Sequence, residues 1–190
     1  MGKAKDHLLW TESSRVKVAS ASVFDLFLSR RTSADGRSGD FALLSAVDWV
    51  NVVPVILGTS GEIRFLMVRQ YRHGIEEVTT EFPAGLMDPG EEPQVAAARE
   101  LLEETGRTAG RLTFLGKTST IPSFMSNWCY TYLAEDLSAP AGQALDRLEV
   151  LDVIETPKNE LEASLGTGEY TNSLVMTALL WYNLRKAPSP

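Results

Sequence analysis

Three glutamates lie close together in a segment that has the pattern of a helix: Glu100, Glu103 and Glu104. Pro93 suits the first turn of such a helix, and Gly106 suits the left-handed position just after its end. Successive helical residues are about 100° apart, so the three carboxylates fall within one stripe. Like charges at this spacing destabilise a bare helix, whereas hard cations such as Mg²⁺ take carboxylate oxygens and also bind substrate phosphates. The stripe therefore predicts a divalent-metal site, although by composition alone a solvated acidic face is the commoner interpretation.

The opposite side of this helix is expected to face the core. Three apolar residues fall there at helical spacing: Val95, Ala98 and Leu102. Two small residues, Ala96 and Ala97, border the acidic stripe. They are expected to leave room for a substrate close to the helix.

The order of residues around the glutamates is more specific than their charge. Gly85 is followed after five residues by Glu91, and after seven more by the run Arg99–Gly106, RELLEETG. So many specified positions at fixed spacing rarely arise by chance, and they resemble the Nudix box. The pattern departs once, at Arg107, where the family usually has an aliphatic residue. The resemblance implies an α/β/α sandwich that hydrolyses a nucleoside diphosphate linked to another group.

The resemblance also implies roles for individual residues of the box. By the family pattern, Glu100 and Glu104 are metal ligands, and Glu103 ligates or assists in catalysis. The carbonyl group of Ala84, just before the box, commonly adds a ligand. Arg99 and Glu91 resemble the pair that orients the catalytic loop and helix. The implied cofactor is Mg²⁺, with Mn²⁺ as an alternative.

The flanks of the box narrow the resemblance. The segments VRQYR and EFPAGLMDPGE, together with Pro122, are similar to the ADP-ribose pyrophosphatase and nucleoside-diphosphate-sugar branch. In this branch an arginine at the end of the VRQYR-like strand contacts the diphosphate. The matching residue is Arg72, and Arg69 is a second candidate. The alternative for either is a surface arginine paired with a carboxylate.

Residues near the N-terminus are implied to hold the rest of the substrate. In the same branch an aromatic residue and an arginine from N-terminal strands commonly hold the base and a phosphate. Trp10 precedes the first predicted strand, and Arg30 and Arg31 end the second. Trp10 is equally well explained as a core residue at the start of the chain.

The branch also supplies an acid from a loop after the strand that follows Pro122. The loop here is AEDLSAPAGQALDRLEVL, and the family pattern places Asp146 where a glutamate is usual. Asp146 is therefore the predicted general base. The reserve candidates are Glu149, Glu135 and Asp136.

Other chemistry is disfavoured by residue counts and spacing. The two histidines, His7 and His73, are far apart in sequence, and without a cysteine cluster they make no zinc site. The single cysteine, Cys129, lies between aromatic residues in an apolar segment and is expected to be buried and inert. One cysteine forms no internal disulfide, which fits a reducing cytoplasm.

The helices and strands that must position these residues are predicted to form an α+β fold. Strands are predicted over 15–19, 22–31, 40–47, 50–57, 62–71, 112–119, 127–134 and 147–154, and helices over 93–105, from 156 and over about 171–185. Residues 1–48 form an antiparallel β meander, and residues 49–190 form the Nudix domain. Such a small meander cannot bury both of its faces alone, so it must pack on the rest of the chain or on another subunit. In the branch that the chain resembles, the N-terminal meander is exchanged across a homodimer, and the resemblance therefore implies a homodimer here.

Composition limits the partners of this chain. It has 190 residues, of which 44% are hydrophobic and 23% charged, as in a globular chain with a sizeable core. The net charge is −7, the opposite of what general binding to nucleic acid requires. No apolar run is long enough to span a membrane, and no secretory signal is recognised, so a cytoplasmic location is expected.

Together these features predict an enzyme that hydrolyses the diphosphate bond of ADP-ribose or a related nucleoside diphosphate sugar. The substrate is a small nucleotide, and the products are a nucleoside monophosphate and a sugar phosphate. GDP-mannose or another nucleotide sugar is the alternative substrate. A nucleotide-binding Nudix module without catalysis is less well supported, because all three carboxylates of the box are retained.

Overall fold

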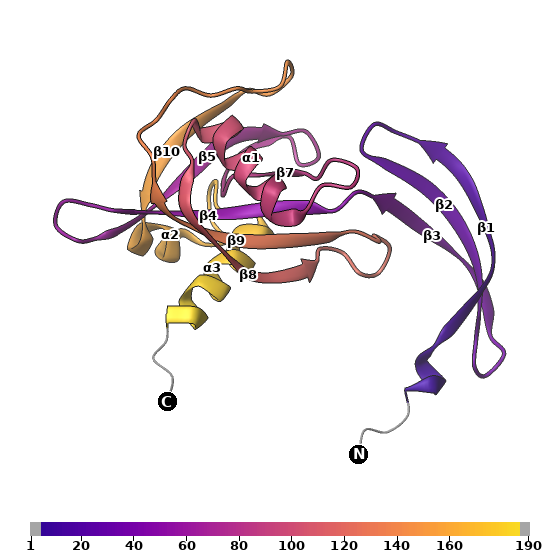
Figure 1. Cartoon of the computed structure of the whole chain (residues 1–190). Coiled ribbons are helices and arrows are strands. Elements are labelled where there is room, and N and C mark those ends of the chain that lie inside the picture. Colours follow the sequence, from indigo (N-terminus) through magenta and orange to yellow (C-terminus); the bar gives the residue numbers. More distant parts are fainter. Residues whose placement is uncertain (1–4, 187–190) are drawn as a thin grey trace. The chain divides into compact units, whose positions relative to one another are not determined.

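The computed structural model describes residues 5–186, and the chain divides into two compact units (Figure 1). The first unit contains Met1–Val47 and Ser119–Trp128, and the second contains Asp48–Thr118 and Cys129–Pro190. The segment Ser119–Trp128 joins the N-terminal strands through Leu44. The amide of Leu44 donates to the carbonyl of Phe124 at 2.7 Å. The first unit is therefore larger than the predicted N-terminal meander by one loop.

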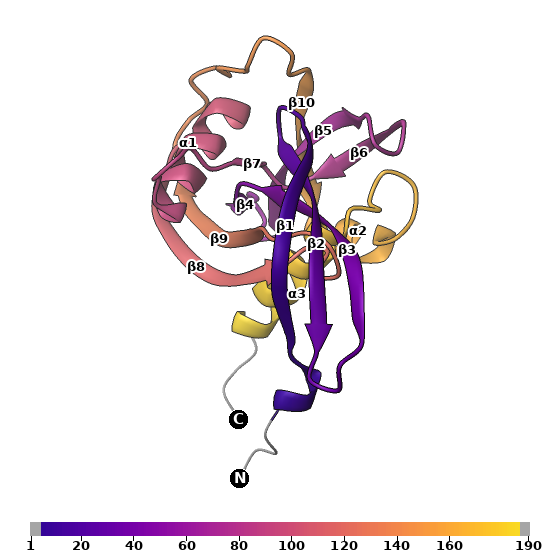
Figure 2. The same cartoon turned by 90° about the vertical axis from the view of Figure 1, so that its right-hand side faces the viewer.

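The first unit is an antiparallel three-stranded sheet (Figure 2). It begins with a short 3₁₀ helix, η1 (Asp6–Leu8), and continues with β1 (Trp10–Ser20), β2 (Phe24–Ser33) and β3 (Ser38–Ala46) in the order β1-β2-β3. Gly36, in the turn between β2 and β3, has a φ of 88°, which a side chain disfavours. The predicted meander is confirmed, and β1 begins five residues before its predicted start at Arg15.

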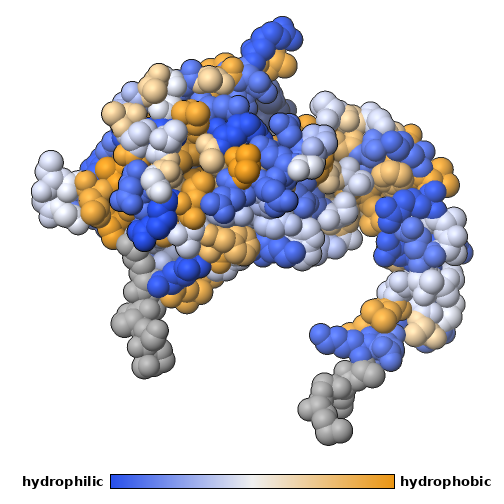
Figure 3. Space-filling model, viewed as in Figure 1, coloured by the Kyte–Doolittle hydropathy of each residue, from blue (hydrophilic) through white to orange (hydrophobic). Residues whose placement is uncertain are grey.

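The N-terminal sheet carries much apolar surface, part of which is seen in Figure 3. All 11 residues of β1 are exposed, including Val16 and Val18. Further exposed apolar side chains within residues 5–47 are Leu8, Leu9, Trp10, Val23, Phe24, Leu28, Phe41 and Val47. Apolar residues of strands are normally covered by another layer, so this sheet has apolar surface that an additional partner could bury.

The second unit is built on a mixed sheet. Its central strands are ordered β10-β5-β4-β9-β8, with β6 paired to β5 and β7 paired to β4. The strands are β4 (Trp49–Leu57), β5 (Ile63–Arg72), β6 (Glu77–Glu81), β7 (Ala84–Leu86), β8 (Ala109–Ser119), β9 (Trp128–Leu137) and β10 (Leu151–Pro157). The central strand β4 runs parallel to β9, and its residues Val50–Val53 are buried. Burial of successive residues is typical of a strand that is covered on both faces.

Helices cover both faces of this sheet (Figure 1). Helix α1 (Pro93–Thr105) packs on one face in a cluster with Val50, Val52 and Tyr132. Helices α2 (Lys158–Ser164) and α3 (Ser173–Lys186) contribute to a second cluster, which is centred on Phe65. Its ring lies edge-to-face against those of Phe82 and Tyr182. The predicted α/β/α sandwich is confirmed.

The element bounds also differ from prediction at β10, the last strand of the sheet. The strand predicted over 147–154 is β10, which starts only at Leu151. Residues before it form a turn in which the amide of Glu149 donates to the carbonyl of Asp146 at 2.9 Å. In the described part of the chain, no helix has the length and apolar character needed to cross a membrane.

Candidate active site

Helix α1 presents its carboxylates to the protein, not to solvent. Its buried residues include Ala96, Ala97, Glu100, Leu101 and Glu104. The prediction that Val95, Ala98 and Leu102 face the core is wrong, because these three residues are exposed. The small alanines allow the helix to approach β4 and β7 closely, and this approach carries the two glutamates inward.

Glu100 and Glu104 are buried carboxyl groups close to each other. Their exposed fractions are 7% and 2%. Burial, followed by the negative charge of Glu100, raises the pKa of Glu104 to about 8. Burial also raises the pKa of Glu100, against the opposing effect of Arg99. Neighbouring negative charges add to the effect of burial on the pKa of both groups: Glu100 acts on Glu104, and Glu103 and Glu149 act on Glu100. Such a site favours a positive charge.

Gly85 is required by the position of Glu100. A Cβ atom on Gly85 would lie 2.1 Å from the carboxyl carbon of Glu100. The neighbouring amide of Ala84 donates to Oε2 of Glu104 at 3.1 Å. The two carboxylates therefore pack directly against the backbone of β7, which is where the resemblance places a carbonyl ligand.

Arg99 connects the helix to the loop before it. Its Nε and Nη2 atoms donate to Glu91 at 3.0 and 2.9 Å, and Nη2 also donates to the carbonyl of Leu86. Its Nη1 atom donates to Glu100 at 2.7 Å and to Glu103 at 3.0 Å. Glu103 is more exposed than the other two carboxylates of the stripe. The expected orienting pair of Arg99 and Glu91 is thus present, and Arg99 also pairs with two of the predicted metal ligands.

The carboxylates fit a hard divalent cation by their chemistry. Glu100 and Glu104 are oxygen donors whose mutual repulsion a cation would relieve. Between residues 5 and 186, no three His, Cys, Asp or Glu side chains form a ready-made coordination shell. Arg99 takes one oxygen each from Glu100 and Glu103, so the second oxygen of each carboxylate is not bonded to Arg99.

The two candidate arginines of β5 lie on opposite faces of the sheet. Arg69 donates to Glu169 at 2.8 Å, on the face that α2 and α3 cover. Arg72 instead pairs with Glu81, and the negative charges of Glu104 and Glu149 also act on it. The structure therefore places Arg72 beside the carboxylates of α1, and it places Arg69 in an ion pair elsewhere.

The loop between β9 and β10 brings Glu149 to the site. The pKa of Glu104 is raised mainly by burial and by the charge of Glu100, and the charge of Glu149 raises it further. The predicted base, Asp146, and Glu149 are both exposed, and the backbone amide of Asp146 donates to Oε2 of Glu149 at 3.1 Å. Leu151 pairs with Gln70, so continuing this antiparallel register sets Glu149 opposite Arg72. Of the reserve candidates, Glu149 is the one beside the carboxylates of the box.

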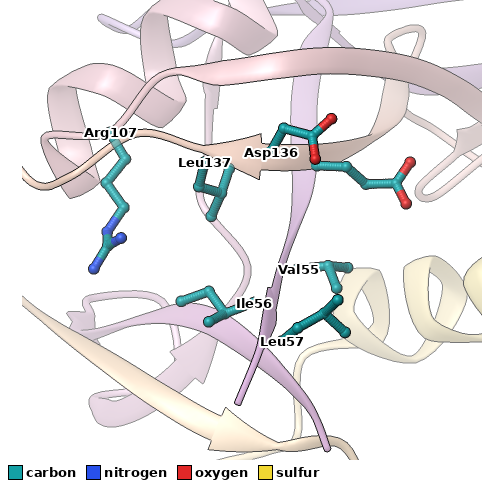
Figure 4. Close-up of a pocket in the computed structure, with 7 residues that line it drawn as sticks. Val55, Ile56, Leu57, Arg107, Asp136 and Leu137 are labelled. Carbon is teal, nitrogen blue, oxygen red and sulfur yellow. The ribbon is translucent and has the colours of Figure 1, made fainter. Parts of the chain in front are cut away.

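The other reserve candidates line a different feature, a cavity of about 300 Å³ (Figure 4). Val55, Ile56 and Leu57 lie on one side of it, and Arg107, Asp136 and Leu137 on the other; Glu135 also lines it. The guanidinium of Arg107 donates to the carbonyl of Ser138 at 3.1 Å. An arginine is therefore accommodated at the position where the Nudix box usually has an aliphatic residue, and no carboxylate of the box lines this cavity.

The start of the loop that carries Glu149 is fixed to the end of α1. The amide of Ala144 donates to the carbonyl of Glu103, and the side chain of Gln143 donates to the carbonyl of Glu104. These are free carbonyls of the last helical turn. The amide of Ala141 donates to Gly106, whose φ of 67° ends the helix. A Cβ on Gly106 would lie 2.6 Å from the carbonyl oxygen of Gly142.

The N-terminal candidates belong to the first unit and are described within it. Trp10 packs edge-to-face on Phe41, and Arg30 pairs with Asp40. Arg31 pairs with Glu12 and lines a cavity of about 210 Å³. The other lining residues are Arg15, Leu43, Leu44, Ser45, Pro122, Phe124, Met125 and Ser126. Arg31 thus lies at a recess that Trp10 and Arg30 do not line; the roles of all three stay predictions.

Glu81 has a clear place in this site although no role was predicted for it. It belongs to the EFPAG segment, and the sequence marks it only as a polar residue among apolar ones. Its side chain is 3% exposed and paired with Arg72. A buried acid in a short strand requires a partner, and this requirement is the signal that could have identified it.

Comparisons with known proteins agree with this geometry. The chain is 29% identical over 175 residues to an ADP-ribose pyrophosphatase of Bacillus subtilis (strain 168), with 92% of each chain covered. It is 33% identical to the ADP compounds hydrolase NudE of Escherichia coli (strain K12), covering 68% of this chain and 67% of that one. A crystal structure of an ADP compounds hydrolase has a TM-score of 0.80, 26% identity and 93% coverage of both chains.

The family assignment rests on a match that covers more than half of the chain. Residues 47–171 match the NUDIX domain, and this range includes the box and the strands that support it. The fold, the buried glutamates of α1 and the Arg99–Glu91 pair are consistent with that match. The chain therefore belongs to the Nudix family and is a Nudix hydrolase.

Proposed function

We propose that the protein hydrolyses the diphosphate bond of ADP-ribose or a closely related nucleoside diphosphate sugar. The observation that carries this proposal is the juxtaposition of buried Glu100 and Glu104 with Arg72 on one face of the sheet. Carboxylates and a guanidinium side by side suit a ligand that is both metal-bound and anionic. The names of the relatives supply the substrate class: they are pyrophosphatases and hydrolases of ADP-ribose and other ADP compounds.

A divalent cation, Mg²⁺ or alternatively Mn²⁺, would be held by Glu100, Glu104 and the carbonyl of Ala84, with Glu103 ligating or assisting. Such an ion neutralises diphosphate charge and activates water when it is bound. Arg72 binds the diphosphate and orients it over the carboxylates. Arg69, which is paired with Glu169, is not needed for this role.

Water attacks one phosphorus atom, and the bridging P–O bond breaks. A carboxylate takes the proton of that water. We propose Glu149 for this step ahead of Asp146, since Glu149 acts electrostatically on Glu104 and Arg72. Hydrolysis of ADP-ribose in this way gives AMP and ribose 5-phosphate.

The N-terminal sheet is proposed to complete the protein as a homodimer and to hold the base. The exposed apolar residues of β1 support dimerisation. The recess lined by Arg15 and Arg31 supports a role for Arg31 in binding an anionic group, and the exposed ring of Trp10 is available to stack on a base.

The test is a panel of ADP-ribose, GDP-mannose, other nucleotide sugars, dinucleotides and nucleoside triphosphates, assayed with Mg²⁺, with Mn²⁺ and with a chelator. Release of AMP from ADP-ribose with the highest kcat/KM, dependent on the metal, is the expected result. A higher kcat/KM for GDP-mannose would identify the alternative substrate, a nucleotide sugar other than ADP-ribose. Tight binding without turnover of any compound would identify a nucleotide-binding module instead.

A further inference from the structure

The orientation of Arg72 depends on a single buried carboxylate. Its Nε atom donates to Oε1 of Glu81 at 2.8 Å, and its Nη2 atom donates to Oε2 at 2.6 Å. Two parallel bonds of this kind fix the plane of the guanidinium, as well as its position. Among the residues that the structure describes, Nη1 of Arg72 has no hydrogen-bond partner. One edge of the guanidinium is therefore held, and one nitrogen is left for a ligand.

The β5–β6 register explains how this geometry arises. Arg72 is paired with Glu77 across the hairpin, whereas Glu81 is paired with Val68. The side chain of Arg72 must therefore run back along the sheet to reach Glu81. Without that partner, an arginine next to the hairpin turn would be free to extend into solvent. Glu81 thus draws the guanidinium over the face that carries the carboxylates of α1.

Glu81 is itself held in place by its surroundings. Its side chain is 3% exposed, whereas that of Arg72 is 42% exposed. The hydroxyl of Thr79 donates to Oε1 at 2.5 Å, and the side chain of Asn172 also hydrogen-bonds to the carboxylate. Burial acts to raise the pKa of Glu81, but these bonds and the charge of Arg72 lower it below its ordinary value. The carboxylate is therefore a buried, charged anchor for a more exposed arginine.

We propose that Glu81 is a positioning residue, which acts through Arg72 to present the Nη1 edge of the guanidinium to a diphosphate group. This inference rests on the proposed role of Arg72. Glu81 does not touch the substrate. Its carboxylate sets the direction from which Arg72 approaches, and it offsets part of the charge that Arg72 brings to the site.

The first experiment compares Glu81→Gln with Glu169→Gln. Glu169 is the matched control, because it forms an ion pair with Arg69, which lies on the other face of strand β5 from Arg72. Binding of inorganic pyrophosphate in the presence of Mg²⁺ is measured by calorimetry, and kcat/KM is measured with ADP-ribose. Glu81→Gln is expected to weaken both by about 10- to 100-fold, the usual range for residues that orient a ligand-contacting group. Glu169→Gln is expected to stay close to wild type. Equal losses in the two variants, or no loss in Glu81→Gln, would overturn the proposal.

A double-mutant cycle with Arg72→Gln separates positioning from a merely structural role. If Glu81 acts only through Arg72, adding Glu81→Gln to Arg72→Gln leaves kcat/KM unchanged. Losses that multiply in the double variant would show that Glu81 acts independently, and they would reject the proposal. Melting curves of all variants show whether the fold is retained.

A milder variant covers the case in which Glu81→Gln does not fold. Thr79→Val removes only the hydroxyl that donates to Glu81. It is expected to weaken pyrophosphate binding by a smaller factor in the same direction, and unchanged binding would count against the proposal. Pyrophosphate binding also separates this inference from the proposed function. A wild-type protein that binds pyrophosphate but does not hydrolyse ADP-ribose would refute the function and leave the role of Glu81 open to the same comparison.

Discussion

The backbone amide of Ala84 lies 3.1 Å from Oε2 of Glu104, so a strand and a helix meet at this one carboxylate. The carboxylate is 20 residues away in sequence and is buried. Because the amide takes one oxygen, the other is available for a cation at the position where the family pattern places a metal ligand. Glu104 is therefore a structural link, and it is also the proposed metal ligand.

Glu104→Gln should lower kcat by several orders of magnitude while the fold is retained. The amide preserves the shape and the hydrogen bond from Ala84 but removes the charge that a cation requires. Turnover of ADP-ribose with Mg²⁺ is the measurement, and circular dichroism checks the fold. Glu160→Gln, at an exposed position of α2, is the control. Activity above a tenth of wild type in Glu104→Gln would contradict the metal-site assignment.

The stability of the metal-free protein should fall as pH rises from about 4.5 towards 8. The pKa of Glu104 is raised from 4.5 to about 8 in the folded chain. In this interval the folded chain holds a proton that the unfolded chain has lost, so stability decreases with pH. The slope is at most about 1.4 kcal/mol per pH unit for one group. Urea unfolding in a chelating buffer measures it.

Glu104→Gln is the control for this pH effect, because it removes the titrating group and should flatten the slope. Addition of Mg²⁺ at pH 8 should raise the free energy of unfolding of the wild-type protein but not that of the Glu104→Gln variant. A metal-free wild type whose stability rises across the whole interval would show that Glu104 does not dominate the titration.

Gly85→Ala should reduce kcat/KM by at least about ten-fold. The added methyl would lie within 2.1 Å of the carboxyl carbon of Glu100 and must displace it. Gly74→Ala is the matched control, since its Cβ would meet no atom within 4 Å. The two variants are compared by ADP-ribose turnover and by the Mg²⁺ concentration needed for half-maximal rate. Equal behaviour of the two would mean that the position of Glu100 is not critical.

Glu149→Gln should lower kcat by about 100-fold or more, as is usual for loss of a general base. Asp146→Asn, in the same turn, should have a much smaller effect, because Asp146 contacts Glu149 through its backbone amide. Rates are measured at saturating ADP-ribose. The reverse ranking would restore Asp146 as the base.

The protein should be a homodimer in solution. An interface that covers the exposed apolar residues of the N-terminal sheet would bury upwards of about 2,000 Å². Light scattering at micromolar concentration should give twice the chain mass of 20.9 kDa. Val16→Lys together with Val18→Lys should shift the mass towards the monomer. A monomeric wild type would exclude the dimer.

The sequence allowed the helix and its limits to be predicted, and the box marked the glutamates that the structure then places on it. Pro93 and Gly106 mark the ends of α1 in the structure as expected. Which side of α1 faces inward was predicted wrongly, because hydrophobicity favoured Val95 and Leu102. Close packing of alanines on the sheet decided the orientation instead, and residue types alone do not report the distance between a helix and a sheet.

The partners of Arg72 also could not be read from the sequence. Whether Arg69 or Arg72 lies beside the carboxylates depends on which face of β5 each occupies, and that depends on the register with β6. The choice between Asp146 and Glu149 depends in the same way on where β10 begins. Motifs predict which residue types are present, whereas strand register determines which of them meet.

The anchoring of the β9–β10 loop to the end of α1 limits how far Glu149 can travel. A chain spans at most about 3.5 Å per residue, so Glu149 stays within about 7 Å of Leu151, which β10 holds. On its other side, Ala144 is hydrogen-bonded to the helix. Tethered at both ends, the carboxylate searches a small volume, and little conformational entropy is lost when it is positioned for the proposed proton transfer. Lengthening the segment between Ala144 and Leu151 would enlarge that volume, so the length of this loop sets the effective concentration of the proposed base.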